Sequence, residues 1–122
     1  VDVLAHCAES FFSRSANHIS RCYAVEGIRL LLRVFRGVGE AGWEDLDYDT
    51  REKLYCASLY GGLAINVTGT CFPPPMGYLL TESCGIPHGT ACAVFQKDFY
   101  EYNKEVVPQL AEEYLQRSFL LQ

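Results

Sequence analysis

Two short segments far apart in the sequence hold the residues that could do chemistry. Asp2 and His6 are four residues apart, and on a helix this spacing puts a carboxylate and an imidazole one turn apart on one face. Together they could bind one divalent ion, and His88 could supply a third ligand from a second element. Spacing alone leaves an alternative open, because such a pair also forms an ordinary hydrogen bond on a helix surface. Glu9 could orient the His6 ring or be an exposed helix glutamate.

Helical patterns predict that an all-α helical bundle positions these residues. A first helix is expected over residues 1–13. Asn17 can cap a second helix, which should end at the glycines from Gly37 to Gly42. The apolar residues of this second helix recur with helical period and should lie in the core: Ile19, Cys22, Tyr23, Ile28, Leu31, Leu32 and Phe35.

The second half of the chain is rich in turn signals. Asp47 or Asp49 can cap a third helix, whose small residues allow close packing. The run Phe72-Pro73-Pro74-Pro75 predicts an extended stretch, because each proline fixes its own φ and disfavours the α conformation of the residue before it. A short helix should follow, near residues 76–83.

Prolines also mark the last two expected helices. Pro87 suits the first turn of a helix that runs to about Asn103, and Pro108 likewise opens a final amphipathic helix. We find no internal repeat or low-complexity segment in the sequence. A single domain over residues 1–122 is therefore expected.

Composition narrows the classes of partner. The chain has 122 residues, of which 49% are hydrophobic, and its net charge is −5. This charge argues against nucleic acid or an anionic membrane as partner, since both need clustered lysine and arginine. The longest apolar runs are far shorter than the roughly 20 residues that span a bilayer.

Six cysteines could form a disulfide framework, but other features favour free thiols. No signal-like segment and no CxxC pair is present, and Cys7, Cys22, Cys56 and Cys92 lie among apolar residues. We therefore expect reduced, mostly buried thiols in a cytoplasmic protein.

Several segments follow one another in an order that is typical of a known family. They are Asp2-Val-Leu-Ala-His6-Cys-Ala-Glu9, Ala16-Asn17-His18-Ile19-Ser20, Ala24-Val-Glu26-Gly-Ile28-Arg29, Arg51-Glu-Lys-Leu-Tyr55-Cys-Ala57, Gly61-Gly62-Leu-Ala64-Ile-Asn66, Met76-Gly-Tyr78 and Gly85-Ile-Pro-His88-Gly89. Over about residues 1–103 the chain therefore resembles the C-terminal helical domain of iron-containing (group III) alcohol dehydrogenases, which share the dehydroquinate synthase-like fold.

This resemblance implies a larger enzyme. In the family an N-terminal α/β domain binds NAD or NADP, and a divalent metal lies in the cleft between the two domains. The chain would then be a fragment that lacks the cofactor domain and whose C-terminal domain continues past Gln122. In such enzymes the metal stabilises the alkoxide of a small alcohol or aldehyde substrate for hydride transfer to the nicotinamide. By itself, the fragment should not transfer hydride.

The resemblance also implies a ligand set. Asp2, His6 and His88 match three of the family's metal ligands, and the fourth ligand position, a histidine in related sequences, is Pro74 here. Two imidazoles and one carboxylate can still hold Fe²⁺ or Zn²⁺, but more weakly than four protein ligands. Tyr78 stands where many members have a second histidine, so its phenol could contact substrate or pack.

Three other residues are judged against this pattern. His18 stands where the family often has proline, so we interpret it as a surface residue rather than a ligand. Cys71 and Cys84 flank the proline run and the Pro-His-Gly turn, and a thiolate from either could replace the missing imidazole.

Two functions from different classes remain. The chain could be the metal-binding half of an NAD(P)-dependent alcohol dehydrogenase, or a non-catalytic helical scaffold or dimerisation domain with a degenerate metal site. Measurement of bound metal would distinguish these two functions. Absence of the cofactor domain should leave an apolar surface exposed, so we also expect self-association.

Overall fold

The computed structural model describes residues 1–39, 42–71 and 73–120, apart from the side chain of Pro74. Within these ranges the chain is all-α, with no strand, which confirms the predicted fold class. The elements are α1 (Asp2–Phe12), α2 (His18–Val38), α3 (Tyr48–Thr68), α4 (Pro73–Cys84), α5 (His88–Val94), α6 (Gln96–Val106), α7 (Pro108–Leu115) and a terminal π-helix, η2 (Gln116–Leu120).

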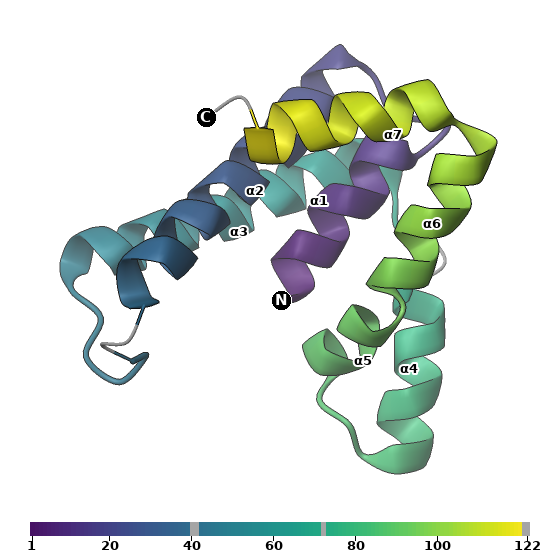
Figure 1. Cartoon of the computed structure of the whole chain (residues 1–122). Coiled ribbons are helices and arrows are strands. Elements are labelled where there is room, and N and C mark those ends of the chain that lie inside the picture. Colours follow the sequence, from purple (N-terminus) through teal and green to yellow (C-terminus); the bar gives the residue numbers. More distant parts are fainter. Residues whose placement is uncertain (40–41, 72, 121–122) are drawn as a thin grey trace.

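Helix α1 lies at the centre of the fold. It packs against the antiparallel pair α2 and α3 on one side and against α5 on the other, while α7 crosses above it (Figure 1). Phe11 of α1 and Ile28 of α2 are fully buried in the core. The end of α1 that carries Asp2 therefore faces the α4–α5 pair.

Local sequence explains where α2 and α3 begin. The Asn17 side chain accepts a hydrogen bond from the Ser20 amide at 2.9 Å, and the Ser20 hydroxyl accepts one from the Asn17 amide at 3.0 Å, which together form a capping box. Asp47 caps α3 by accepting from the Thr50 amide at 2.8 Å. Both caps confirm the sequence predictions, with Asp47 chosen over Asp49.

The expected extended stretch at the prolines is wrong. Pro73, Pro74 and Pro75 form the first turn of α4, where an amide has no acceptor within the helix, so a proline loses nothing there. Phe72, the first residue of that stretch, lies outside the described residues.

The expected helix from Pro87 to about Asn103 is in fact two helices, and it begins one residue after Pro87. Helix α5 ends at Val94, where the Phe95 amide donates to the Cys92 carbonyl, three residues back, at 3.3 Å. The Phe95 carbonyl then accepts from the Phe99 amide at 2.9 Å and starts α6. This tight turn redirects the chain away from α4.

The second helix is less buried than its apolar pattern predicted. Ile28 and Leu31 are in the core, but Ile19 and Phe35 are 60% and 38% exposed. Ser20 and Val38, near the same two ends of α2, are buried, so the core-facing side of the helix does not include Ile19 and Phe35. All six thiols are free, but the expectation that most are buried is wrong. Only Cys7 and Cys92 are buried, whereas Cys56 and Cys71 are half-buried and Cys22 and Cys84 are exposed.

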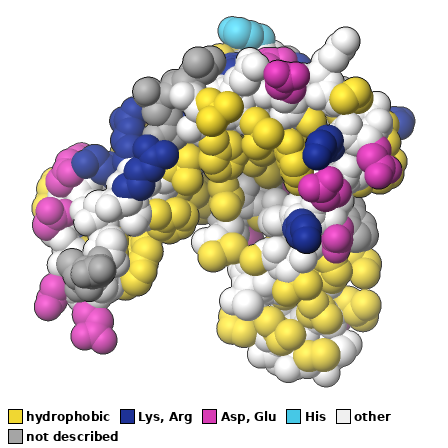
Figure 2. Space-filling view, in the orientation of Figure 1, with side chains coloured by type: hydrophobic (Ala, Val, Ile, Leu, Met, Phe, Trp, Pro, Cys, Tyr) yellow, Lys and Arg dark blue, Asp and Glu magenta, His cyan; other side chains and the backbone are white. Residues whose placement is uncertain are grey.

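The surface is hollowed between the end of the α2–α3 pair, where α2 ends and α3 begins, and helices α4 and α5. Hydrophobic side chains gather along that hollow (Figure 2). Among the described residues, no helix is both long enough and apolar enough to cross a membrane.

Candidate metal centre

The two sequence segments with candidate ligands meet where the N-terminal ends of α1 and α5 approach one another. The Asp2 Oδ1 atom lies 3.8 Å from His6 Nε2 and 3.9 Å from His88 Nε2. His6 is one turn along α1, as its spacing predicted, and His88 comes from the first residue of α5. The structure thus brings His6 and His88 each to the Asp2 carboxylate, although His6 is not part of the described group whose ligand atoms all lie within 4.8 Å of one another.

A glycine sets the approach of the two helices. A Cβ atom added to Gly89 would lie 3.3 Å from Asp2 Cβ, a tighter contact than usual, and 3.5 Å from the Asp2 amide nitrogen, an ordinary van der Waals contact. A residue with a side chain here would require α1 or α5 to shift by a few tenths of an ångström. The glycine after His88 is therefore part of how the sequence positions the site.

The Asp2 carboxylate has an unsatisfied oxygen. Oδ1 is buried and accepts no hydrogen bond from any residue that the structure describes, and both imidazoles lie beyond hydrogen-bond distance. Buried polar atoms are normally paired, and an orphaned carboxylate oxygen beside two imidazole nitrogens is what a divalent cation would satisfy. The residues present therefore fit a metal ion.

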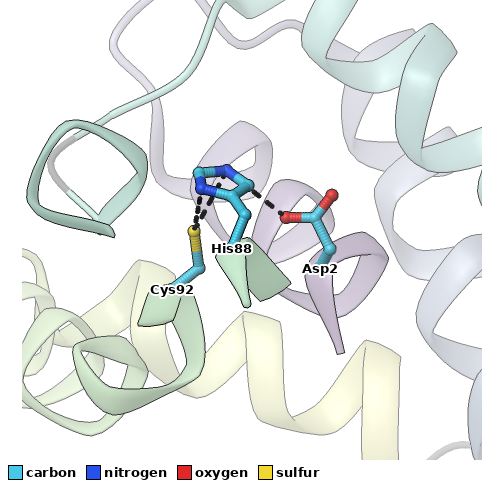
Figure 3. Close-up of side chains that lie close together, drawn as sticks. All are labelled: Asp2, His88 and Cys92. Atoms are coloured by element: carbon cyan, nitrogen blue, oxygen red, sulfur yellow. Dashed lines mark hydrogen bonds and ion pairs between the residues drawn. The ribbon is translucent and has the colours of Figure 1, made fainter. Parts of the chain in front are cut away.

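The structure adds a residue that the sequence reasoning did not consider as a ligand. Cys92, one turn after His88 on α5, places its Sγ 3.5 Å from His88 Nε2 (Figure 3). Asp2, His88 and Cys92 each offer one ligand atom, and these atoms all lie within 4.8 Å of one another. The sequence did contain a signal for Cys92 as a ligand, because His88 and Cys92 have the same four-residue spacing as Asp2 and His6.

Tyr78 contributes a ring to the site. It stacks on the His88 imidazole with ring centroids 4.4 Å apart and an interplanar angle of 23°. Its side chain is 57% exposed, so one face of the stack remains open to solvent. Stacking restricts rotation of the imidazole.

The other candidate residues lie elsewhere. His18 is exposed at the start of α2, as expected. Cys71 donates its thiol hydrogen to the Glu9 carbonyl at 3.6 Å, and Cys84 is exposed at the last residue of α4. Pro74 is the second residue of α4.

Glu9 takes neither of its two expected roles. It is fully buried, and its Oε2 accepts a hydrogen bond from the Cys71 amide at 2.9 Å, which ties α1 to the segment before α4. Burial raises the pKa of this carboxyl from 4.5 to about 7; the Cys71 amide opposes the rise and the Asp2 charge adds to it. Glu9 is a buried structural carboxyl, not a surface residue.

Known proteins have similar sequences and a similar fold. Residues 1–119 match the family described as the Fe-containing alcohol dehydrogenase family, C-terminal. A 1,3-propanediol dehydrogenase of Citrobacter freundii is 30% identical over 109 residues, which are 89% of this chain and 27% of that protein. Maleylacetate reductase of Rhizobium sp. is 29% identical over 112 residues, which are 91% of this chain and 31% of that protein.

The solved structure of an iron-containing alcohol dehydrogenase from Thermotoga maritima has a TM-score of 0.83 and 28% identity to this chain, covering 98% of it and 32% of that protein. The chain belongs to the iron-containing alcohol dehydrogenase family and corresponds to its C-terminal domain. It spans about a quarter to a third of the length of the relatives it matches.

Proposed function

We propose that the chain is the metal-binding half of an NAD(P)-dependent alcohol dehydrogenase and that Asp2, His6 and His88 bind Fe²⁺ or Zn²⁺. The observation that carries this proposal is the buried, unsatisfied Asp2 Oδ1, which lies 3.8 and 3.9 Å from two imidazole nitrogens. Membership of the iron-containing alcohol dehydrogenase family supports alcohol dehydrogenation as the reaction. When bound, such an ion supplies Lewis-acid stabilisation of the substrate oxygen during hydride transfer.

The chain's own residues hold and orient that site. Asp2 supplies the negative charge, and the two imidazoles must be neutral to act as ligands, so ion binding should weaken in acid. Tyr78 fixes the plane of the His88 ring by stacking on it. NAD or NADP would bind through a further domain, and the substrate would be a small alcohol or aldehyde.

The cellular setting follows from the thiols. All six cysteines are free in the structure, and free thiols persist where the environment is reducing. The free thiols therefore support our proposal that the protein is cytoplasmic.

A second function is favoured by one observation. Proline stands at position 74, where the family pattern has a metal-binding histidine, and proline has no ligating side chain. A scaffold or dimerisation domain would tolerate this loss, whereas a dehydrogenase would need to compensate for it.

Metal titration separates the two functions. Calorimetric titration of the apo chain with Zn²⁺ should show one site, and His88→Ala should weaken binding by at least about tenfold, since changes even to groups around metal ligands cost that much. His18→Ala is the matched control, because His18 is a helix-start histidine far from the cluster, and it should bind as the native chain does. Absence of binding, or equal affinities in all three proteins, would establish the scaffold instead.

A further inference from the structure

We propose that Cys92 is a metal ligand, so that the centre is a carboxylate, imidazole and thiolate site rather than one of carboxylate and imidazoles alone. This inference rests on the proposed metal-binding function and specifies its donor set. It also explains how the chain compensates for the proline at position 74. A thiolate ligand shifts preference toward ions that accept sulfur, of which Zn²⁺ is the most common in proteins.

The distances agree with this coordination. With a zinc–sulfur bond of about 2.3 Å, a zinc–nitrogen bond of about 2.0–2.1 Å and a tetrahedral angle, the two ligand atoms would lie about 3.6 Å apart. Cys92 Sγ and His88 Nε2 are 3.5 Å apart. The Asp2 Oδ1 atom lies 3.9 Å from the same nitrogen, a few tenths of an ångström more than such a site requires.

The thiol is held in place by its surroundings. Cys92 is fully buried on α5, and a Cβ atom added to Gly77 of α4 would lie 2.8 Å from its Sγ and 3.3 Å from its amide nitrogen. The absence of a side chain at Gly77 therefore lets α4 close directly over the thiol. In Figure 3, the His88 ring lies between Cys92 and Asp2.

Cys71, Cys84 and Cys22 do not have this environment. Cys71 Sγ is committed to the Glu9 carbonyl, and Cys84 is exposed. Cys22 is the informative comparison, because its Sγ lies 3.7 Å from His18 Nε2, one turn away on α2, in nearly the same relation as Cys92 and His88. Cys22 and His18 are both exposed, and they do not belong to the cluster that includes Asp2.

The binding step is a proton exchange with no redox change. The Cys92 S–H bond breaks, a sulfur–metal bond forms from the thiolate lone pair, and one proton passes to solvent. Zinc stays divalent and the sulfur keeps its oxidation state.

Substitution with Co²⁺ tests the inference by spectroscopy rather than by activity. Under anaerobic, reducing conditions the native chain should bind one Co²⁺ and show an intense sulfur-to-cobalt charge-transfer band in the near ultraviolet. Cys92→Ser should lose the band and bind Co²⁺ at least about tenfold more weakly, by comparison with the cost of altering groups around metal ligands. Cys22→Ser, the matched control, should keep both the band and the affinity.

Two outcomes would overturn the inference, and they differ from failure of the proposed function. If the native chain binds Co²⁺ without the charge-transfer band, Cys92 is not a ligand although the metal site stands. If the band persists in Cys92→Ser, the thiolate comes from another cysteine. If the native chain binds no Co²⁺ at all, the proposed metal-binding function fails together with the inference.

Discussion

At the scale of single residues, the chemistry depends on a few atoms at the meeting point of α1 and α5. The charge of Asp2 is partly buried beside two imidazoles, and such an arrangement costs free energy unless a cation compensates it. Metal binding should therefore stabilise the fold as well as complete the site, because only the folded chain brings the ligands together.

Position 74 provides a direct test of the ligand set. In a Cys92→Ser background, Pro74→His should restore a fourth protein ligand and raise Zn²⁺ affinity by at least about tenfold, since affinity follows the number and type of ligands. The substitution should be tolerated, because the second residue of α4 lies in the first turn.

Pro75→His is the control for that test. Pro75 is exposed on the next residue of the same turn, so a histidine there should leave Zn²⁺ affinity unchanged in titration calorimetry. Equal affinities for the Pro74→His and Pro75→His chains would mean that the family's fourth ligand position does not carry over to this protein.

Glu9 should give the protein a pH-dependent stability. Its folded-state pKa is raised to about 7 by burial, so the folded state binds the proton more tightly than the unfolded state does. The stabilising contribution is complete below the unfolded pKa of about 4.5 and is lost as pH rises through about 7, with a total change on the order of 3 kcal/mol.

Glu9→Gln isolates this effect, because glutamine keeps an oxygen to accept from the Cys71 amide but does not titrate. Urea denaturation of metal-free protein at about pH 5 and about pH 7.5 should show a loss of unfolding free energy in the native chain and a smaller loss in the variant. The same loss in both chains would assign the pH dependence to other groups.

At the scale of elements, the packing of α4 on α5 determines the shape of the site. Gly77→Ala would place a Cβ atom 2.8 Å from Cys92 Sγ and 3.3 Å from its amide nitrogen. The Cys92 thiol must therefore move, and the α5 backbone must shift by a few tenths of an ångström. We expect a loss of about 1–3 kcal/mol in unfolding free energy, the usual cost of overpacking, together with weaker Zn²⁺ binding.

A second glycine in a helix interior gives the matched comparison. A Cβ atom added to Gly62 of α3 meets nothing within 4 Å, so Gly62→Ala should stabilise the protein by about 0.5–1 kcal/mol through helix propensity. Chemical denaturation of the three proteins would measure both effects. Stabilisation by Gly77→Ala would show that α4 and α5 are not in close contact in solution.

At the scale of the whole molecule, one face of α3 is apolar and exposed. Tyr55, Leu59 and Leu63 recur every four residues along it and are 73%, 53% and 37% exposed. A row of this kind buries its apolar area when two copies associate, so we expect the chain to self-associate through α3. Leu59→Lys should shift the equilibrium to monomer in sedimentation measurements.

Tyr102→Lys is the control for surface charge. Tyr102 is 65% exposed on α6, so its replacement adds the same charge to a different apolar position. A monomeric native chain, or dissociation by Tyr102→Lys and not by Leu59→Lys, would reject the α3 surface as the site of association.

Sequence alone determined the features that depend on neighbours along the chain. The caps at Asn17 and Asp47 and the Asp2–His6 pair all rest on contacts within one turn, and local spacing fixes such contacts. The resemblance to the alcohol dehydrogenase family is confirmed as well. Local reasoning failed at the prolines because proline has the same φ in an extended stretch and in a first helical turn.

Tertiary structure decided the features that depend on which faces of two helices meet, namely the burial of Glu9 and the position of Cys92. Glu9 and His6 lie on the same helix, but it is Glu9 that accepts a hydrogen bond from the Cys71 amide, and burial raises the pKa of its carboxyl. Cys92 becomes a candidate ligand only because α5 brings it and His88 to Asp2, 90 positions earlier in the sequence. Such contacts depend on helix packing angles and on the close approach at Gly77 and Gly89, which no local spacing specifies.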